Sequence, residues 1–310
     1  MARMLEGLVA VVTGSGRGIG RAHALRLAAY GALVVVNDIG VSITGESTEE
    51  QPGDEVVRSI TESGGVAVLD AHDVSTTDGA TALVERALDE FERIDILVNN
   101  AGIGRPKMVF NMDDEQWDDV IRVHLRSTFL TTRRACQWWR SESKAGRNHP
   151  GRIINTATGL LPMGGAGQSN YVAAKAGVVA FTAAVAQEME PYAVTANALM
   201  PGARTRMADV GWRMDALEAD QESRDPEHVA ELACYLASPA AQWISGQCFS
   251  VSGHRIGHEI AWSHRDALHR PDRGWTADDL VHEMPRFFGA GPSPNEKPPA
   301  AWSEAGRKLE

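Results

Sequence analysis

The chain begins with a strand pattern that runs directly into a glycine-rich turn. Leu8–Val12 is a continuous apolar run, typical of a strand covered on both faces in a parallel sheet. Residues 13–20 follow, Thr-Gly-Ser-Gly-Arg-Gly-Ile-Gly, and then a helical pattern over Arg21–Tyr30. This order predicts a dinucleotide-binding turn, with a pyrophosphate at the positive end of the helix. A flexible connection is the simpler alternative, because the spacing is not Gly-x-Gly-x-x-Gly.

An acidic residue closes the second apolar strand and indicates which dinucleotide is bound. Leu33–Val36 ends at Asn37 and Asp38, about twenty residues after the glycine turn. A carboxylate in this place can accept hydrogen bonds from the adenine ribose hydroxyls and would repel a 2′-phosphate. Arg17 favours the opposite choice, since a guanidinium can pair with that phosphate. We give Asp38 more weight, because it lies where the ribose edge must go, and expect NAD.

Strand and helix patterns alternate over most of the chain. Strands are expected at Leu8–Thr13, Leu33–Asn37, Val66–Leu69, Ile94–Asn99, Arg152–Thr156, Thr195–Leu199 and Cys248–Val251. Helices are expected at Arg21–Tyr30, Asp54–Ser63, Asp78–Glu92, Trp117–Arg140, Tyr171–Glu190 and Glu227–Ala237. Repeated strand–helix units predict a Rossmann-type α/β fold, a doubly wound parallel sheet between two helical layers. Its ligands should bind at the carboxyl ends of the strands.

The length fits one domain with an appendage. We expect a dinucleotide-binding domain over residues 1–256, with a lid at 203–224, and a partly irregular extension over 257–310. Within the extension, Thr276 and Asp279 are spaced as a helix-starting capping box. The histidines of this tail have no metal-ligand spacing, so no metal site is expected.

Composition narrows the cellular setting. A formal net charge of −11 gives no support to a nucleic-acid surface. The three scattered cysteines fit a reducing cytoplasm better than a disulfide framework. The first strand leaves no room for a signal peptide, and the apolar helix after Tyr171 is interrupted by Lys175 and looks too short to cross a bilayer. We therefore expect a cytoplasmic protein with no membrane partner.

Tyr171 and Lys175 are the strongest chemical signal. They belong to the predicted helix and stand four residues apart, so they share one face. A nearby ammonium favours the phenolate, which would make Tyr171 a proton donor or acceptor near neutral pH. On its own such a pair fits an ordinary surface helix equally well.

Four motifs together resemble the short-chain dehydrogenase/reductase family. They are Thr13-Gly14-x-x-x-Gly18-Ile19-Gly20, Asn99-Asn100-Ala101-Gly102, Tyr171-x-x-x-Lys175 and Pro201-Gly202. The resemblance implies that Tyr171 is the catalytic acid/base and that Lys175 binds the nicotinamide ribose and lowers the Tyr171 pKa. It also implies that Asp73 and Val74 contact the adenine. The expected cofactor-binding residues are Gly14, Arg17, Gly18, Ile19, Gly20, Asp38, Asp73, Val74, Asn100, Ala101, Gly102, Tyr171, Lys175, Pro201 and Gly202.

Two positions depart from the family pattern. Thr158, thirteen residues before Tyr171, stands where the family usually has Ser; its hydroxyl can make the same hydrogen bond to the substrate oxygen. His124 stands where the family usually has Asn, and its ring could relay protons from Lys175 to water. A histidine bound to a backbone carbonyl is the alternative for His124. If both changes weakened the chemistry, the chain would bind NAD without turnover.

Further segments resemble the dehydrogenase region of peroxisomal multifunctional enzymes and its bacterial single-domain relatives. They include Val34–Gly40, Val123-His124-Leu125-Arg126 and Gly167–Tyr171. The resemblance implies a 3-hydroxyacyl-CoA substrate, a hydroxysteroid or other hydrophobic secondary alcohol as the alternative, and a homodimer or homotetramer. The residues considered for CoA phosphates, or for a solvated rim, are Arg105, Lys107, Arg204, Arg206 and Arg213. Those considered for an apolar pocket, or for packing of the lid, are Met163, Met207, Trp212, Met214 and Leu217.

Overall fold

The computed structural model describes residues 3–46, 51–161, 164–203, 224–260, 267–268, 270 and 274–287. The strands are β1 (Val9–Thr13), β2 (Leu33–Asn37), β3 (Val66–Asp70), β4 (Ile96–Asn99), β5 (Arg152–Thr156), β6 (Thr195–Pro201), β7 (Cys248–Ser252) and β8 (Arg255–Glu259). The helices are α1 (Gly18–Ala29), α2 (Pro52–Glu62), α3 (Thr77–Phe91), α4 (Asp114–Ile121), α5 (Ser127–Lys144), α6 (Ser169–Met189), α8 (Pro226–Ala237) and α9 (Ala277–Phe287). Short turns of helix are η1 (Val109–Asn111), η2 (Arg122–Arg126), η3 (Glu190–Tyr192) and η6 (Pro239–Ala241).

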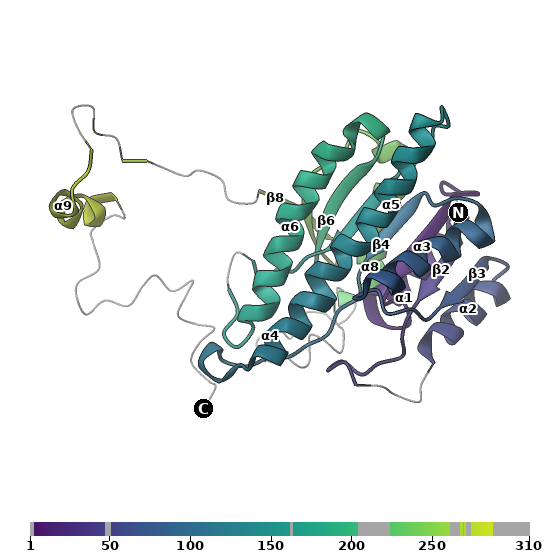
Figure 1. The fold of residues 1–310 in the computed structure, drawn as a ribbon, viewed down its shortest axis with the longest axis horizontal. Helices are drawn as coiled ribbons and strands as arrows, with labels where there is room; N and C mark the ends of the chain where they lie inside the picture. Colours follow the sequence, from purple (N-terminus) through teal and green to yellow (C-terminus); the bar gives the residue numbers. More distant parts are fainter. Residues whose placement is uncertain are drawn as a thin grey trace.

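The described strands form one sheet in the order β3-β2-β1-β4-β5-β6-β7-β8. Every neighbouring pair is parallel except β7 and β8, which are antiparallel. The chain leaves β1 in one direction along the sheet and returns at β4 on its other side, which opens a crevice at the carboxyl ends of these strands. Helices α3, α5 and α6 cover one face of the sheet and α1, α2 and α8 the other (Figure 1). The predicted Rossmann-type fold is confirmed.

Alternation along the strands builds a separate core on each face. Ala10 and Val12 of β1 pack with α1, α2 and α8, whereas Val9 and Val11 pack with α3, α5 and α6. Since successive side chains of a strand point to opposite faces, an unbroken apolar run is what a strand buried on both sides requires.

The structure differs from the sequence-based expectation at the end of the sheet and in one long helix. The antiparallel strand β8 was not predicted; it extends the sheet to Glu259, so the expected domain boundary after residue 256 falls inside it. The single helix expected at Trp117–Arg140 begins at Asp114, ends at Lys144 and is interrupted by η2, one wide π-helical turn. Asp113 and Gln116 form the capping box that starts this helix.

Helix α6 begins two residues earlier than expected, at Ser169, and continues into η3. Ser169–Tyr192, which joins α6 to η3, is 24 residues long and apolar enough to cross a membrane, so the expectation that this helix is too short is wrong. Only length and composition support a membrane span, however, and a core helix passes the same test. Here α6 packs against β5 and β6, and its apolar side chains belong to the core on that face of the sheet.

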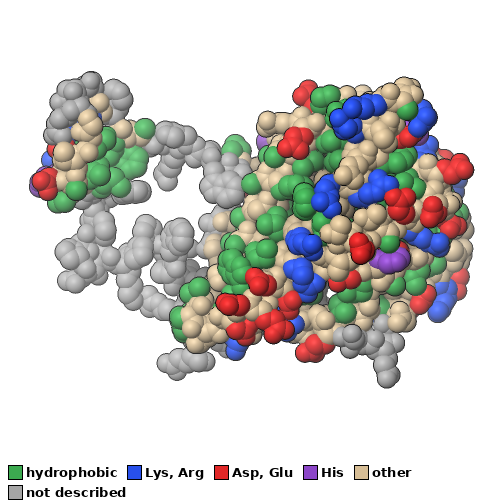
Figure 2. All heavy atoms as spheres, in the orientation of Figure 1, with side chains coloured by type: hydrophobic (Ala, Val, Ile, Leu, Met, Phe, Trp, Pro, Cys, Tyr) green, Lys and Arg blue, Asp and Glu red, His purple; other side chains and the backbone are tan. Residues whose placement is uncertain are grey.

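Positive and negative charges are mixed on the surface. On the face shown in Figure 2, Lys and Arg side chains are interspersed with Asp and Glu.

The C-terminal tail contains one described helix, α9. The expected capping box at its start is confirmed, since the Asp279 N–H donates to the Thr276 hydroxyl oxygen at 3.2 Å and α9 begins at Ala277. Helix α9 lies apart from the sheet and its covering helices (Figure 1). The predictions for 204–223 and for Met163 concern residues outside the described ranges.

Candidate active site

A cavity of about 840 Å³ opens at the carboxyl ends of the strands, around the crevice between β1 and β4. Cavities of this size accommodate cofactors and substrates. It is lined by Gly14, Arg17, Gly18, Ile19, Asp38, Asp73, Val74, Asn100, Ala101, Gly102, His124, Thr158, Tyr171, Lys175, Pro201 and Gly202. Of the predicted site residues only Gly20 lies behind the lining. A Cβ there would come within 2.1 Å of the Gly14 oxygen, so Gly20 lets α1 pack against the turn.

The glycine turn is held open by backbone conformation and by a neighbouring asparagine. Gly14 has a φ of +62°, and a Cβ on it would lie 2.8 Å from the Cα of Ala101. The Asn100 side-chain amide donates to the carbonyl oxygens of Thr13 and Gly14 at 3.2 and 3.1 Å. The turn therefore leaves room along its backbone, which is what the close approach of a pyrophosphate needs.

Asp38 joins the glycine turn to the end of β2. Its carboxylate accepts hydrogen bonds from the Gly16 N–H at 2.8 Å and from the Gly40 N–H at 2.9 Å. These bonds hold the carboxylate at the cavity wall, and its oxygens keep lone pairs that can accept from ribose hydroxyls. Asp38 thus lies at the cavity wall, as predicted from the sequence, and its charge would repel a 2′-phosphate bound there.

Three of the predicted catalytic groups meet in the cavity. Tyr171 and Lys175 lie on the first turns of α6, and the Lys175 ammonium is 5.9 Å from the centre of the Tyr171 ring. Its Nζ donates to the carbonyl oxygen of Thr156, the last residue of β5, at 2.6 Å, and Thr158 stands two residues further on. The Thr158 hydroxyl is hydrogen-bonded to Tyr171. A hydroxyl, a phenol and an amine therefore line the same cavity.

The expected lowering of the Tyr171 pKa is wrong for this arrangement. Burial raises the pKa of Tyr171, and the hydrogen bond from Thr158 only partly opposes that effect. Burial also lowers the pKa of Lys175 to about 7, so its side-chain amine is only partly protonated at neutral pH. The geometric pairing predicted from the sequence is present, but the surrounding protein disfavours charge on both groups.

His124 lies beside Tyr171 on the wide turn η2. The two rings meet edge to face with centroids 5.1 Å apart, and a Cβ on Gly102 would come within 2.4 Å of the imidazole. His124 Nε2 lies 2.7 Å from the Ile103 carbonyl oxygen, so the carbonyl contact considered from the sequence is present. Its Nδ1 is buried without a hydrogen-bond partner. Burial and the Lys175 charge lower the His124 pKa to about 3, so the ring is neutral; its part in a proton relay stays a prediction.

Asn170 is a site residue whose role the sequence did not reveal. Its side-chain amide donates to the carbonyl oxygens of Arg105 and Gln116 at 3.1 and 3.0 Å, and its oxygen accepts from the Tyr171 N–H at 2.7 Å. The side chain thus ties the start of α6 to α4 and to the loop after β4. Only its place beside Tyr171 could have drawn attention to it, because its partners are backbone atoms of distant segments.

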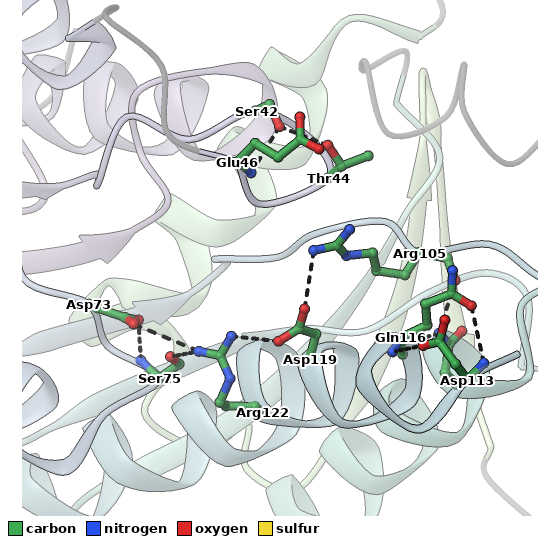
Figure 3. A network of polar contacts seen from close by, with 11 residues as sticks. Ser42, Thr44, Glu46, Asp73, Ser75, Arg105, Asp113, Gln116, Asp119 and Arg122 are labelled. Carbon is green, nitrogen blue, oxygen red and sulfur yellow. Dashed lines mark hydrogen bonds and ion pairs between the residues drawn. The ribbon is translucent and has the colours of Figure 1, made fainter.

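A chain of charged groups crosses the wall of the cavity between the loop after β4 and the end of β3 (Figure 3). Asp119 on α4 is its centre: its two oxygens bind Arg105 at 3.2 Å and Arg122 at 2.8 Å. Arg122 also lies 3.7 Å from Asp73. The two arginines lower the pKa of Asp119. Of the described residues considered for a substrate phosphate, Arg105 lines the cavity, whereas Lys107 does not.

This geometry agrees with what comparison with known proteins shows. The family model for short chain dehydrogenases matches residues 8–213. The chain therefore belongs to the short-chain dehydrogenase family and is an oxidoreductase; members of this family generally use NAD or NADP. The resemblance recognised from the motifs is confirmed. Within the described residues, no group of three or more His, Cys, Asp or Glu side chains is placed to hold a metal.

Individual relatives indicate which kinds of dehydrogenase the chain resembles. It is 41% identical over 297 residues to the hydroxyacyl-CoA dehydrogenase ChsB1 of Mycobacterium tuberculosis, and this alignment covers 94% of this chain and 92% of that protein. It is 38% identical to peroxisomal multifunctional enzyme type 2 of Mus musculus, over 83% of this chain and 33% of that longer protein. A crystal structure of a short chain dehydrogenase from Mycobacterium avium is 41% identical, with a TM-score of 0.83 over 94% of this chain and 98% of that one.

Proposed function

We propose that this protein is an NAD-dependent dehydrogenase of 3-hydroxyacyl-CoA thioesters. The observation that carries the proposal is the meeting of Tyr171, Thr158 and Lys175 in one cavity whose other end is bounded by Asp38. The similarity to a hydroxyacyl-CoA dehydrogenase over nearly the whole chain supports the thioester substrate. A 3-oxoacyl-[acyl-carrier-protein] reductase of Synechocystis, 40% identical over 81% of this chain, also bears an acyl group in its name.

The residues present fit a bound dinucleotide. Gly14 leaves the space that a pyrophosphate needs, and the Asp38 carboxylate faces the cavity. In the proposed complex, Asp38 accepts from the adenine ribose, Asp73 and Val74 contact the adenine, and Lys175 binds the nicotinamide ribose. When bound, the nicotinamide supplies the hydride acceptor that the reaction requires.

The proposed chemistry assigns one task to each side chain. Thr158 and Tyr171 bind the substrate oxygen, and Tyr171 exchanges one proton with it. Burial favours the protonated phenol, which donates its proton to the ketone in reduction; in oxidation the phenolate takes the proton of the alcohol. Lys175, whose pKa lies near 7, exchanges protons with its surroundings at neutral pH. His124, with its unpartnered Nδ1, provides an acceptor next to this path.

The test is NADH formation by the purified protein. We expect turnover of 3-hydroxyacyl-CoA thioesters with NAD and at most weak turnover with NADP. The variant Asp38→Ser should raise the use of NADP relative to NAD about tenfold or more, since it removes a charge that repels the 2′-phosphate. The matched control Asp54→Ser changes an exposed acid on α2, outside the cavity lining. It should leave the preference unaltered.

Other outcomes would assign the site differently. Turnover of free hydroxysteroids or other secondary alcohols, with none of thioesters, would move the substrate to that class. NAD binding without turnover of any of them would contradict the proposed reaction. We also propose a homodimer or homotetramer in the cytoplasm, which sedimentation of the purified protein and fractionation of cells would test.

A further inference from the structure

A second cavity lies at the opposite edge of the sheet from the candidate active site. Its volume is about 690 Å³, and it shares no lining residue with the first cavity. It is bounded by the start of β5, the last turns of α6, the segment that leads into β6 and the loop that leads into β7. The first cavity opens at the carboxyl ends of the strands, so the second belongs to their amino ends. Nothing in the proposed dehydrogenase reaction uses it.

The wall of this cavity contains a buried arginine without an acidic partner. Arg152, the first residue of β5, is only 5% exposed. One of its guanidinium nitrogens donates to the Gly151 carbonyl oxygen at 2.8 Å, while its Nε is buried without a hydrogen-bond partner. No carboxylate in the described part of the chain forms an ion pair with it.

The nearest candidate for a partner is already engaged. Asp95 accepts from Arg93 at 2.8 and 2.7 Å and from the Val9 N–H at 2.8 Å. Burial lowers the pKa of Arg152 and Asp95 opposes this, but a guanidinium keeps its charge at physiological pH. Asp95 thus supports the charge of Arg152 without forming an ion pair with it. A buried cation without a direct anionic partner is costly, and an anion bound beside it recovers part of that cost.

The remaining lining suits a small polar molecule. Four carboxamide residues line the cavity with Arg152, together with Ser245 and with Trp243, which is 77% exposed. The carboxamides are those of Asn148, Gln187, Gln242 and Gln247. One acid, the exposed Glu190, also borders the cavity, so the net charge of the lining is near zero. A multiply charged anion would therefore be held less well than a carboxylate that pairs with one guanidinium.

We propose that the cavity at the amino ends of β5 and β6 binds a small carboxylate, with Arg152 as the residue that pairs with it. The carboxamides of Asn148, Gln187 and Gln242 donate further hydrogen bonds to the ligand, and Trp243 covers it; the Gln247 carboxamide already donates to the Ser245 carbonyl oxygen. The site is separate from the dehydrogenase site, and the proposal holds whichever substrate that site takes.

Calorimetric titration of the full-length protein with butyrate tests the proposal, with butyramide as the uncharged control ligand of similar shape. We expect saturable binding of butyrate and none of butyramide. The variant Arg152→Met should abolish binding, with folding verified by circular dichroism. Absence of saturable butyrate binding, or equal binding of butyramide, would overturn the proposal. So would butyrate binding that persists in a folded Arg152→Met protein.

If Arg152→Met fails to fold, a second pair of variants tests whether the carboxylate binds beside Arg152. Gln187→Glu adds a carboxylate to the wall of the cavity and should weaken butyrate binding about tenfold or more, by competing for the guanidinium. Ala184→Glu adds the same charge to an exposed position of α6 outside the lining. It should change the affinity less than about twofold. Equal effects of the two substitutions would overturn the proposed place of the ligand.

Discussion

The two ends of β5 each hold a buried cation, and the two cations do different things. At the carboxyl end, Lys175 donates to the Thr156 carbonyl oxygen at 2.6 Å. At the amino end, Arg152 donates to the Gly151 carbonyl oxygen at 2.8 Å. Burial lowers the pKa of both, and neither forms an ion pair with a described carboxylate. The lysine can respond by releasing its proton near pH 7, whereas the arginine stays charged and needs an anion.

This difference explains why one edge of the sheet suits proton transfer and the other suits anion binding. A buried amine whose pKa lies near neutrality can exchange protons with a neighbouring phenol. A buried guanidinium cannot, but its planar set of donors matches a carboxylate. The same physical cause, burial of a cation, thus produces two kinds of site. The predictions below test where the two edges differ.

The largest effect is expected at the phenol of the carboxyl edge. Tyr171→Phe removes the proposed acid/base, so turnover should fall by about 10²–10⁴-fold while NAD binding is retained. Steady-state kinetics and a fluorescence titration with NAD check this. Tyr192→Phe, which removes a hydroxyl at the far end of the same helical segment, is the control and should keep its activity. Ordinary turnover in Tyr171→Phe would refute the assigned role.

Lys175 should make folding stability depend on pH. Its pKa is about 7 in the folded protein and 10.5 when unperturbed, so between these values the unfolded chain binds more protons. Stability should therefore rise by a few kcal/mol as the pH increases from 7 towards 10. Urea denaturation across this range should show the rise in the native protein and a smaller one in Lys175→Met.

At the other end of β5, Arg152→Met should not alter the pH dependence of stability, in contrast to Lys175→Met. A guanidinium stays protonated in both folded and unfolded chains over this pH range, so the variant should keep the slope of the native protein. A slope that is the same in Lys175→Met and in the native protein would contradict the lowered pKa of Lys175.

A smaller effect is expected from Asn170, which positions Tyr171. Asn170→Ala leaves two carbonyl oxygens and the Tyr171 N–H without their partners and should cost about 1–3 kcal/mol of stability. If Asn170 positions the phenol, kcat should also fall about tenfold with little change in NAD affinity. Asn111→Ala, at an exposed position of η1, is the control. A loss of stability with unaltered kcat would leave Asn170 a structural residue only.

The smallest effect is expected at Thr158. Thr158→Ser keeps the hydroxyl and removes one methyl group, so activity should stay within about threefold of the native value. Thr158→Val keeps the shape and removes the hydroxyl, and should lower kcat clearly more. Equal activities in the two variants would show that the hydroxyl has no part in the reaction.

Much of the site followed from sequence because its residues stand in short local patterns. The strand, turn and helix around Gly14 to Gly20, the acid after β2 and the pair Tyr171 and Lys175 each lie within one element or one connection. The parallel fold then carries these patterns to a common edge of the sheet. For this reason nearly every predicted residue lines one cavity.

What sequence alone determined was the order of elements, the edge of the sheet that holds the site and the identity of its polar groups. Only the tertiary structure decided their charge. The pair Tyr171 and Lys175 predicts an easily ionised phenol when water surrounds it, but burial in this protein raises the pKa of Tyr171 and lowers that of Lys175. The antiparallel β8, the links made by Asn170 and the isolation of Arg152 were likewise beyond sequence. Each depends on which distant backbone atoms and carboxylates come within a few ångströms, and chain order does not specify that.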